Sequence, residues 1–419
     1  MSPATATSAQ SPAKPTGDMV LSHGQLTRAL KIADLGSAAK SPSEAQRGVL
    51  VETGRHRAVL TTFDYETAVS VSVPGRARKG VSLLHLPQFQ KALAAMAAGE
   101  TKTQAERAEV SLTGDLLSTE HLSVPLAALD LEEFTRPPEP VPAMATVDAK
   151  AFFTELARVL PAAGHDDTLP LLTSVHLSLA GQTLTLAATD RYRLAEGRVA
   201  AEATVQPPAT AVNVLFSADV LSAVLKQFKS YDGPIGVGLL SDQSSDIPRA
   251  TLSLGDTTIT VRARDGKFPT YASFFPNEFV ASVHMDRATL VKAAKKGRAM
   301  TQAVGHKHSP VTLRWDAEAA LALAPVVGSP ADQDRVKGMN IPFTLAHGAA
   351  ENVAGMSVRF NPAYLLDALE AFTSQETVTV HVQEFEEGQS RKPVLLSEDP
   401  TGTDSYRHLL VPVRLDPPQ

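Results

Sequence analysis

The stretch that decides the fold is VHLSLAGQTLTLAATDRYRLA, Val175–Ala195. Runs of alternating apolar and polar residues flank Gly181, a pattern that predicts two antiparallel strands joined by a tight turn. The second run ends at Thr189, and Asp190–Arg193 then present charged and aromatic side chains before the chain becomes apolar again at Leu194. This loop holds no nucleophile-and-base pair, no metal-ligand spacing and no glycine cradle, so it favours docking over catalysis.

Length and composition set the frame for this stretch. A chain of 419 residues is long enough for two to four domains of ordinary size. Hydrophobic residues make up 43% and charged residues 20%, which is typical of a globular protein. The absence of cysteine excludes disulfide scaffolds and thiolate sites and suits a reducing cytoplasm. The net charge of -6 argues against a surface that is basic all round.

No membrane segment is expected. No apolar run approaches the roughly 20 residues of a membrane-spanning helix, and Met1–Asp18 lacks the apolar core of a secretory signal. This first segment is rich in Ser, Thr, Ala and Pro without periodicity, so we expect a disordered tail at residues 1–18. The rest of the chain is expected to be soluble, with no membrane partner.

The remainder of the sequence repeats one order of elements. A helix capped by Ser22, strand-like runs, a second helix over Pro87–Ala98 and further strands lead to the proline-rich linker Thr135–Pro142. The same order restarts at Asp148 and again at Asp286, each a helix cap, at a period of about 130 to 140 residues. Asn361 is expected to cap the second helix of the third repeat, with Pro362 in its first turn. We therefore expect an α+β protein with three similar domains, each with two helices packed on antiparallel sheet, at residues 19–142, 143–282 and 283–419.

Basic residues recur on the helices of all three expected domains, away from the apolar stripes. One such face is usually just solvated, whereas its recurrence favours a shared basic surface. The residues are Arg28, Lys31, Lys150, Arg158, Lys226, Lys229, Lys292, Lys295 and Lys296.

Four separated motifs carry a resemblance to a known family. The chain from about Met19 to Leu415 resembles the bacterial DNA polymerase III beta sliding clamp, and FDYE at Phe63–Glu66 resembles the actinobacterial version. The motifs are DDTLPLLTSVHLSL at Asp166–Leu179, AATDRYRLA at Ala187–Ala195, FNPAYLLDALEAF at Phe360–Phe372 and LLVPVRL at Leu409–Leu415.

The resemblance implies the DNA clamp fold and a head-to-tail homodimer of three-domain subunits that forms a ring around duplex DNA. Such a processivity factor tethers DNA polymerase III subunits, the clamp loader and other DNA-processing partners, without catalysis, metal or cofactor of its own. It would act in the cytoplasm, at the nucleoid. The basic helix residues named above would then face the duplex. Phosphate contacts through Lys and Arg carry no sequence information, as sliding requires.

The resemblance also implies a groove between the second and third domains that receives linear clamp-binding peptides. Read without the resemblance, Leu409–Leu415 is simply a last strand that closes a sheet, and strand residues can serve both roles. The groove residues implied are Leu172, Thr189, Arg191, Tyr192, Arg193, Leu194, Pro269, Phe274, Asn361, Tyr364, Pro393, Leu409, Val411, Pro412, Val413 and Arg414.

This sequence departs from the family at the groove. Methionines are usual where Val411 and Val413 stand, and a smaller residue is common where Phe274 stands. The valine side chain is restricted at its first torsion and phenylalanine is bulky, whereas the flexible methionine side chain adapts to different ligands. The groove should therefore accept fewer ligands. The divergent first domain, the long tail and the extension Asp416–Gln419 also favour a specialised or duplicate clamp. Such a clamp could act as an inhibitor-insensitive, resistance-conferring copy or as a binding module that is not loaded on DNA.

Three weaker signals have ordinary explanations. His306 and His308 lack further metal ligands nearby, so a solvated loop is expected. GRARKG at Gly75–Gly80 lacks the ending of a phosphate-binding loop and is expected to be a basic hairpin tip, near DNA in one interpretation. The acidic pair Asp166 and Asp167 precedes a turn, which explains it better than acid-base chemistry. No constellation typical of a nuclease or another enzyme is found.

Overall fold

The computed structural model describes residues 17–38, 41–166, 168–205, 210–241, 247–304, 309–316, 320–328, 330–333, 335–383, 392–403 and 405–413. The chain forms two compact units: unit 1 comprises Met1–Thr146, Ala203–Gln206 and Lys226–Ala263, and unit 2 comprises Val147–Glu202, Pro207–Leu225 and Arg264–Gln419. The expectations for residues 1–16, Asp167, His306, His308, Arg414 and Asp416–Gln419 lie outside the described residues.

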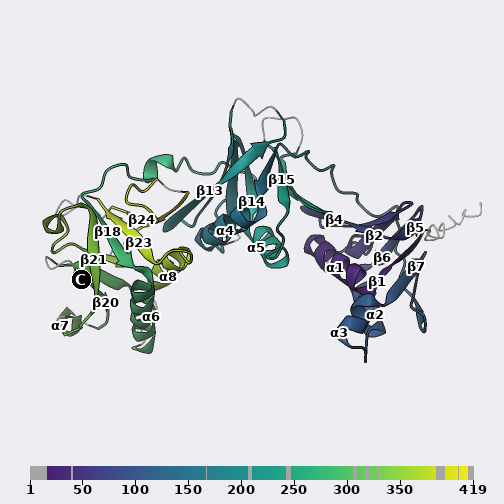
Figure 1. Cartoon of the computed structure of the whole chain (residues 1–419), viewed down its shortest axis with the longest axis horizontal. Coiled ribbons are helices and arrows are strands. Elements are labelled where there is room, and N and C mark those ends of the chain that lie inside the picture. The colour runs from purple at the N-terminus through teal and green to yellow at the C-terminus, as the bar shows by residue number, and fades with distance from the viewer. Residues whose placement is uncertain are drawn as a thin grey trace, which may run out of the picture. The chain divides into compact units, whose positions relative to one another are not determined.

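Unit 1 holds the first repeat and three later strands (Figure 1). Asp18 begins a strand here, so the expected tail extends one residue too far. The elements are β1 (Asp18–Ser22), α1 (His23–Ala33), β2 (Gly48–Thr53), β3 (Arg57–Phe63), β4 (Thr67–Pro74), β5 (Arg76–Arg78), β6 (Gly80–His85), α2 (Leu86–Met96), α3 (Lys102–Arg107), β7 (Glu109–Thr113), β8 (Leu116–Ser118), β9 (Ser123–Pro125), β15 (Pro234–Leu240), β16 (Arg249–Leu254) and β17 (Thr257–Arg262).

Local chemistry explains where α1 begins and which face it buries. The Ser22 hydroxyl accepts from the Gln25 backbone at 3.2 Å, and the Gln25 side chain accepts from the Ser22 backbone at 3.1 Å. This capping box satisfies donors that a helix start leaves open. Leu26, Leu30 and Ala33 recur at helical spacing and are buried, on the side where α1 packs against β3 and β4.

Two sheet connections organise unit 1. The order β5-β1-β7-β8-β9 forms one sheet. In the other, β3 and β4 form a hairpin, and β4 pairs on its far side with β17, from Thr67 opposite Val261 to Val71 opposite Thr257. The last strand of the second repeat therefore completes a sheet that begins in the first repeat.

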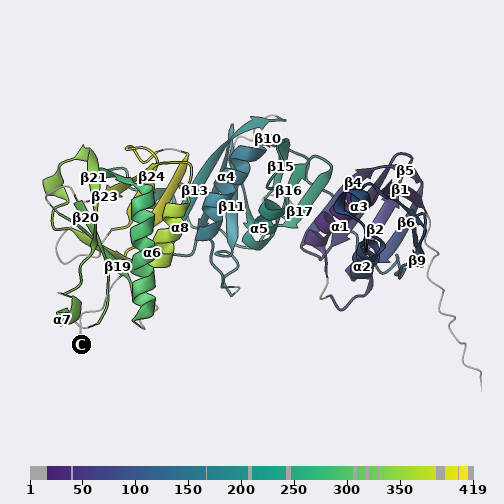
Figure 2. The same ribbon diagram turned by 60° about the horizontal axis from the view of Figure 1, so that its bottom comes forward.

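Unit 2 holds the start of the second repeat and all of the third. In both views α6 and α8 lie side by side on one face of the third-repeat sheet (Figure 2). The elements are β10 (Ala145–Asp148), α4 (Ala149–Val159), β11 (Ser174–Ala180), β12 (Thr183–Thr189), β13 (Arg193–Ala203), β14 (Val212–Ser217), α5 (Ala218–Gln227), β18 (Ala281–Asp286), α6 (Arg287–Ala303), β19 (Val311–Trp315), β20 (Ala320–Pro325), α7 (Pro330–Gln333), β21 (Met339–Gly348), β22 (Ser357–Phe360), α8 (Pro362–Glu370), β23 (Thr377–Val382), β24 (Val394–Ser397) and β25 (Tyr406–Leu410). The ends of β10 and α5 lie in unit 1.

The expected helix caps of unit 2 are confirmed. Asp148 and Asp286 accept from backbone N–H groups of α4 and α6, and Asn361 does so for α8, whose first residue is Pro362. Each cap satisfies an otherwise open donor, and proline has no donor to leave open in the first turn. These caps place Tyr364 in the first turn of α8, where it reaches the site described below.

One strand junction connects the second and third repeats within unit 2. The strand β13 pairs with β12 on one side and with β25 on the other, from Arg193 opposite Leu410 to Gly197 opposite Tyr406. The opening stretch and the last described strand are therefore neighbours in one sheet. Within the described residues, no helix is long and apolar enough to cross a membrane.

Candidate functional site

The loop between β12 and β13 is shaped by its own polar side chains. Asp190 accepts from the backbone N–H of Tyr192 at 3.0 Å and of Arg193 at 3.1 Å. The Thr189 hydroxyl accepts from Arg191 N at 3.1 Å and donates to Arg193 O at 2.7 Å. Arg191 adopts a left-handed backbone with φ 77°, which costs roughly 1 to 2 kcal/mol for a residue other than glycine. The side-chain bonds hold the loop against that strain.

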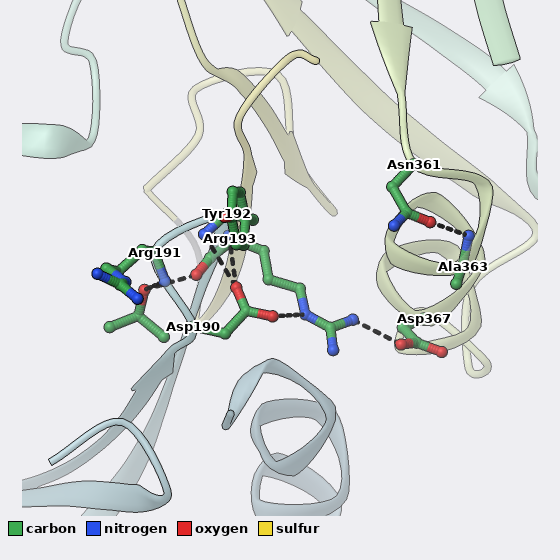
Figure 3. Close-up of polar contacts among 8 residues, drawn as sticks. Asp190, Arg191, Tyr192, Arg193, Asn361, Ala363 and Asp367 are labelled. Atoms are coloured by element: carbon green, nitrogen blue, oxygen red, sulfur yellow. Dashed lines mark hydrogen bonds and ion pairs between the residues drawn. The ribbon is translucent and has the colours of Figure 1, made fainter. Parts of the chain in front are cut away.

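Arg193 is a buried bridge and is not displayed, contrary to the expectation for this loop. Only 4% of its side chain is exposed. Its Nε donates to Asp190 Oδ2 at 3.1 Å, and its Nη1 donates to Asp367 Oδ2 at 2.5 Å (Figure 3). The guanidinium also lies 4.4 Å from the centroid of the Tyr364 ring, a cation–π distance. Arg193 thus fastens the loop to α8.

Three side chains gather at the surface above this bridge. Tyr192 is 57% exposed, and its ring stacks on Tyr364 at 6.0 Å and 24°. Val411 N donates to Tyr192 O at 2.9 Å, and the Val411 side chain is 39% exposed. Burial, followed by the charge of Asp190, raises the pKa of Tyr364 above its usual value. We name Tyr192, Tyr364 and Val411 the docking patch.

An apolar cluster, which we name the floor, lies on the two strands next to the docking patch: β13 follows Tyr192 in sequence and β25 precedes Val411. Leu194 on β13 and Leu409 on β25 are paired across the sheet and buried, and they cluster with Phe275 and Leu395. Pro412 is also buried. These expected groove residues are therefore part of the buried core of the strand junction and are not displayed at the surface. A packed core of this kind fixes the positions of the strands that lead into the docking patch.

The segment that leads into the third repeat is pinned by aromatic rings. Phe268 stacks on His176 at 4.8 Å, and Tyr271 packs edge-on against Phe268 at 5.6 Å and Phe275 at 6.2 Å. Burial lowers the pKa of His176 to about 4, so this ring is neutral at pH 7. Phe274 points outward and is 56% exposed. The anchoring thus leaves one large apolar side chain free of the floor.

The other expected groove residues have separate places. Asn361 caps α8 through Ala363 N at 2.9 Å, and Val413 N donates to Arg359 O at 2.7 Å. Pro393 O accepts from Gln383 at 2.8 Å. No hydrogen bond or ring contact in the described part of the chain joins Leu172, Pro269, Phe274 or Pro393 to the docking patch. Arg414 lies outside that part.

Arg158 does not face solvent, so its assignment to a DNA face is wrong. Its side chain is 8% exposed and pairs with Glu155 at 3.0 Å and with Glu398. Its Nε donates to Ala371 O at 2.9 Å, and its guanidinium lies 5.0 Å from the Tyr406 ring centroid. The helical spacing that placed Arg158 beside Lys150 could not show Ala371, Glu398 and Tyr406, which lie more than 200 residues along the sequence. Arg158 instead ties α4 to the third repeat.

The remaining basic helix positions are exposed. In α6, Lys292, Lys295 and Lys296 lie at helical spacing, and Lys295 Nζ is 2.7 Å from Glu370 Oε1 on α8. Both partners of this pair are about half exposed, so the pair is weak. DNA contact remains a prediction for these residues and for the other exposed ones, Arg28, Lys31, Lys150, Lys226 and Lys229.

Two of the weaker sequence signals are also located. Asp166 accepts from Thr168 N at 3.0 Å, so it forms a turn as expected. Gly75–Gly80 is not a hairpin tip, because Arg76–Arg78 forms the edge strand β5, which pairs with β1. Among the described residues, no three His, Asp or Glu side chains are grouped to hold a metal ion.

Comparisons with known proteins agree on one family. The model for the central domain of the DNA polymerase III beta subunit matches residues 146–270. The beta sliding clamp of Streptomyces coelicolor is 30% identical over 393 residues, which cover 90% of this chain and 94% of that protein. A beta sliding clamp homolog, GriR, from Streptomyces muensis is 27% identical and covers 88% of this chain and 91% of its own. A solved Pseudomonas aeruginosa sliding clamp bound to griselimycin matches at a TM-score of 0.77 and 18% identity, over 96% of this chain and all of that one.

Proposed function

The chain belongs to the beta sliding clamp family of bacterial DNA polymerase III, and from this premise we propose that two copies close head to tail around duplex DNA. It is an accessory protein of the polymerase and not an enzyme. Each copy would contribute three domains, at residues 19–142, 143–282 and 283–419. The ring would work in the cytoplasm, on the nucleoid, where it tethers polymerase III subunits and other DNA-processing partners.

The proposal of a closed ring rests on one observation, a regular pattern of strand pairing between successive repeats. In unit 1 the third strand after the first helix, β4, pairs with β17, the last strand of the second repeat. In unit 2 the equivalent strand β13 pairs with β25, the last strand of the third repeat. The equivalent strand of the third repeat is β21, and the last strand of the first repeat is β9. The rule therefore calls for a third junction between β9 and β21.

Both of these strands offer an edge for that junction. Within the described residues, β9 pairs only with β8, and Met339–Pro342 of β21 pairs only with β20. The rest of β21 pairs with β18. Unpaired strand edges bind other strands readily. We infer that β9 of one copy pairs with β21 of the next, and that two such junctions close the ring.

Cross-linking tests this junction, because the natural chain has no cysteine. We expect Val124→Cys on β9 together with Asn340→Cys on β21 to give a covalent dimer with a short thiol cross-linker. Each single variant is the control, because a head-to-tail contact brings unlike positions together. Light scattering should give twice the 44.4 kDa of one chain. A stable monomer, or equal cross-linking by a single variant, would contradict the ring.

We propose that the docking patch receives linear clamp-binding peptides. The exposed Tyr192 ring and Val411 side chain stand on a buried floor, which is the composition expected of a peptide site: apolar surface with a few polar anchors. The anchors available at its rim are the exposed Arg191 side chain and the Tyr364 hydroxyl. The family's partner peptides from the polymerase and the clamp loader are the proposed ligands.

A specialised role is the second candidate. Val411 and Val413 stand where the family usually has methionine, and Phe274 is bulky and 56% exposed. The stacking of Tyr192 on Tyr364 fixes the Tyr192 ring in one position, which further restricts the ligands that the docking patch can accept. These features favour a clamp that accepts fewer ligands and is insensitive to a groove-binding inhibitor.

Binding measurements distinguish the two roles. We expect weaker binding of griselimycin to this protein than to an ordinary clamp, with a polymerase-derived peptide as the reference ligand. Equally tight binding of both ligands would reject the specialised role. Retention on circular DNA that depends on the clamp loader separates a working ring from a binding module that is not loaded.

A further inference from the structure

The motif Gly75–Gly80 forms one strongly basic end of unit 1 together with the turn between β2 and β3. Gly75 N donates to His56 O at 3.0 Å, and Arg57 pairs with Pro74 across the hairpin. Two segments about twenty residues apart are thereby held together by backbone bonds. We name their exposed basic side chains the basic end: Arg55, His56, Arg57, Arg76, Arg78 and Lys79.

The positive charge of the β3–β4 hairpin is confined to this end. The strand segments 58–63 and 67–73 carry no charged residue, and the turn at the opposite end carries Asp64 and Glu66. Arg76 pairs with Glu109 at 3.0 Å, but both side chains are at least 70% exposed, so water screens this pair. In the described part of the chain, no ion pair involves Arg55, Arg57, Arg78 or Lys79. The end is therefore a net positive surface on a chain of net charge -6.

The composition of the basic end selects one class of partner. Three or more guanidinium groups match phosphate oxygens in a two-point geometry. Apart from the small His56 ring, the end has no aromatic side chain on which the bases of a single strand could stack, since the exposed Tyr65 lies in the turn at the other end. It also has no large apolar side chain of the kind that anchors protein partners.

We propose that the basic end binds the phosphate backbone of duplex DNA, as a second contact beside the basic helix faces. In both views β5 and α1 lie on different sides of unit 1 (Figures 1 and 2), so the two surfaces are separate. Binding is independent of sequence, because the basic end offers cations to phosphates and no group shaped to read bases. Such a contact would hold the duplex at a point that the helix faces do not cover.

The test uses the full chain and a short fluorescent linear duplex, without a clamp loader. A variant with Arg55→Gln, Arg57→Gln, Arg78→Gln and Lys79→Gln should bind at least about tenfold more weakly at low salt. Its slope of log affinity against log salt should be shallower by about 0.9 for each phosphate that the variant no longer neutralises. The matched control is Lys102→Gln with Arg107→Gln, which removes exposed cations from α3.

Each other outcome overturns the proposal. An unchanged slope, or an equal loss in the α3 control, would show that the basic end makes no specific contact. Poly-glutamate that binds the natural protein as tightly as the duplex would point to an acidic protein partner. Self-association of the variant with unchanged DNA affinity would mean that the cations only prevent the edge strand β5 from pairing with another chain. Light scattering on the same samples reports ring formation separately.

Discussion

Arg193 Nη1 lies 2.5 Å from Asp367 Oδ2, so one hydrogen-bonded ion pair fastens the loop after β12 to α8 across 174 residues of sequence. The same guanidinium lies under the Tyr364 ring, on which Tyr192 stacks. The exposed aromatic surface thus takes its shape from a buried cation. The docking patch should respond to changes in this ion pair even where a peptide never touches it.

Replacing this cation should destabilise the protein strongly. Arg193→Met leaves Asp190, 12% exposed, without its charge partner, and such a loss costs about 3 to 5 kcal/mol. Asp367→Asn should cost about 1 kcal/mol or less, because Asp367 is 39% exposed and Arg193 keeps Asp190. Denaturant unfolding measures both, and equal losses in the two variants would contradict the asymmetry.

Tyr192 should contribute to peptide binding more than to stability. Tyr192→Ala removes a stacked ring worth about 1 kcal/mol, but it should weaken a polymerase-derived clamp-binding peptide about tenfold or more, since buried tyrosines dominate interfaces. Tyr192→Phe should keep most of the affinity. Tyr65→Ala, an exposed tyrosine of unit 1, is the control. Calorimetric affinities that do not change in Tyr192→Ala would remove Tyr192 from the site.

Removing the carboxylate that pairs with Lys295 should increase the affinity for DNA. Glu370→Gln frees a lysine that is now 2.7 Å from a carboxylate, so duplex binding should strengthen and its salt slope should steepen by up to about 0.9. Replacing Lys292, Lys295 and Lys296 by Ala should weaken retention with a shallower slope. Glu376→Gln, at another exposed carboxylate, is the control. A triple variant with the natural slope would show that α6 does not face the DNA.

Two basic residues of α4 should behave in opposite ways. Arg158→Met removes the ion pairs of Arg158 with the buried Glu155 and with Glu398, and it should cost about 3 to 5 kcal/mol of unfolding free energy. Lys150→Met, on the exposed face, should change stability by less than about 0.5 kcal/mol. Only the lysine variant should lower the salt slope of DNA binding. If both variants are equally stable, the buried cluster contributes little.

Stability should fall as the pH drops below about 6.5, the ordinary pKa of histidine. Burial lowers the pKa of His381 to about 4 and that of His408 to about 3. The unfolded chain therefore takes up protons first, and the stability present above pH 6.5 is lost as the pH falls toward these folded values. Between pH 7.5 and 5, each histidine should account for a loss on the order of 2 kcal/mol.

Unfolding by denaturant at pH 7.5, 6 and 5 checks this dependence. His381→Gln should flatten the curve, although it also removes the hydrogen bonds of His381 with Ser282 at 2.8 Å and Ser397 at 2.6 Å. The comparison is therefore between slopes and not between absolute stabilities. A variant curve parallel to the natural one would exclude His381 as a source of the pH dependence.

Patterns of residues close together in the sequence predict most of the helices of this protein. Helix starts are predicted by their cap residues, because a cap and its helix are neighbours in sequence. The caps are Ser22, Asp148, Asp286 and Asn361. The helix α3 escaped prediction because it buries none of its residues and so has no apolar stripe.

Long-range partners account for the failures at the site. Arg191 and Arg193 are the same residue type in the same loop, so the sequence does not distinguish them. Arg193 is buried because it packs against Asp367 and Tyr364, whereas Arg191 is exposed. Arg158 was misassigned for the same reason, since Glu398 lies 240 residues away. A charge that is buried by a distant partner leaves no periodic signal.

The pairing of β13 with β25 also imposes an order in time. Glu196 and Arg407, partners across that junction, are 211 residues apart, so a ribosome working at about 5 to 20 residues per second needs about 10 to 40 seconds to travel from one to the other. Throughout that interval β13 has an open edge, and Leu194 has not yet met Leu409. The proposed docking patch therefore cannot form on a nascent chain until the third repeat has emerged. Meanwhile the open edge is a place where it could pair wrongly with another chain.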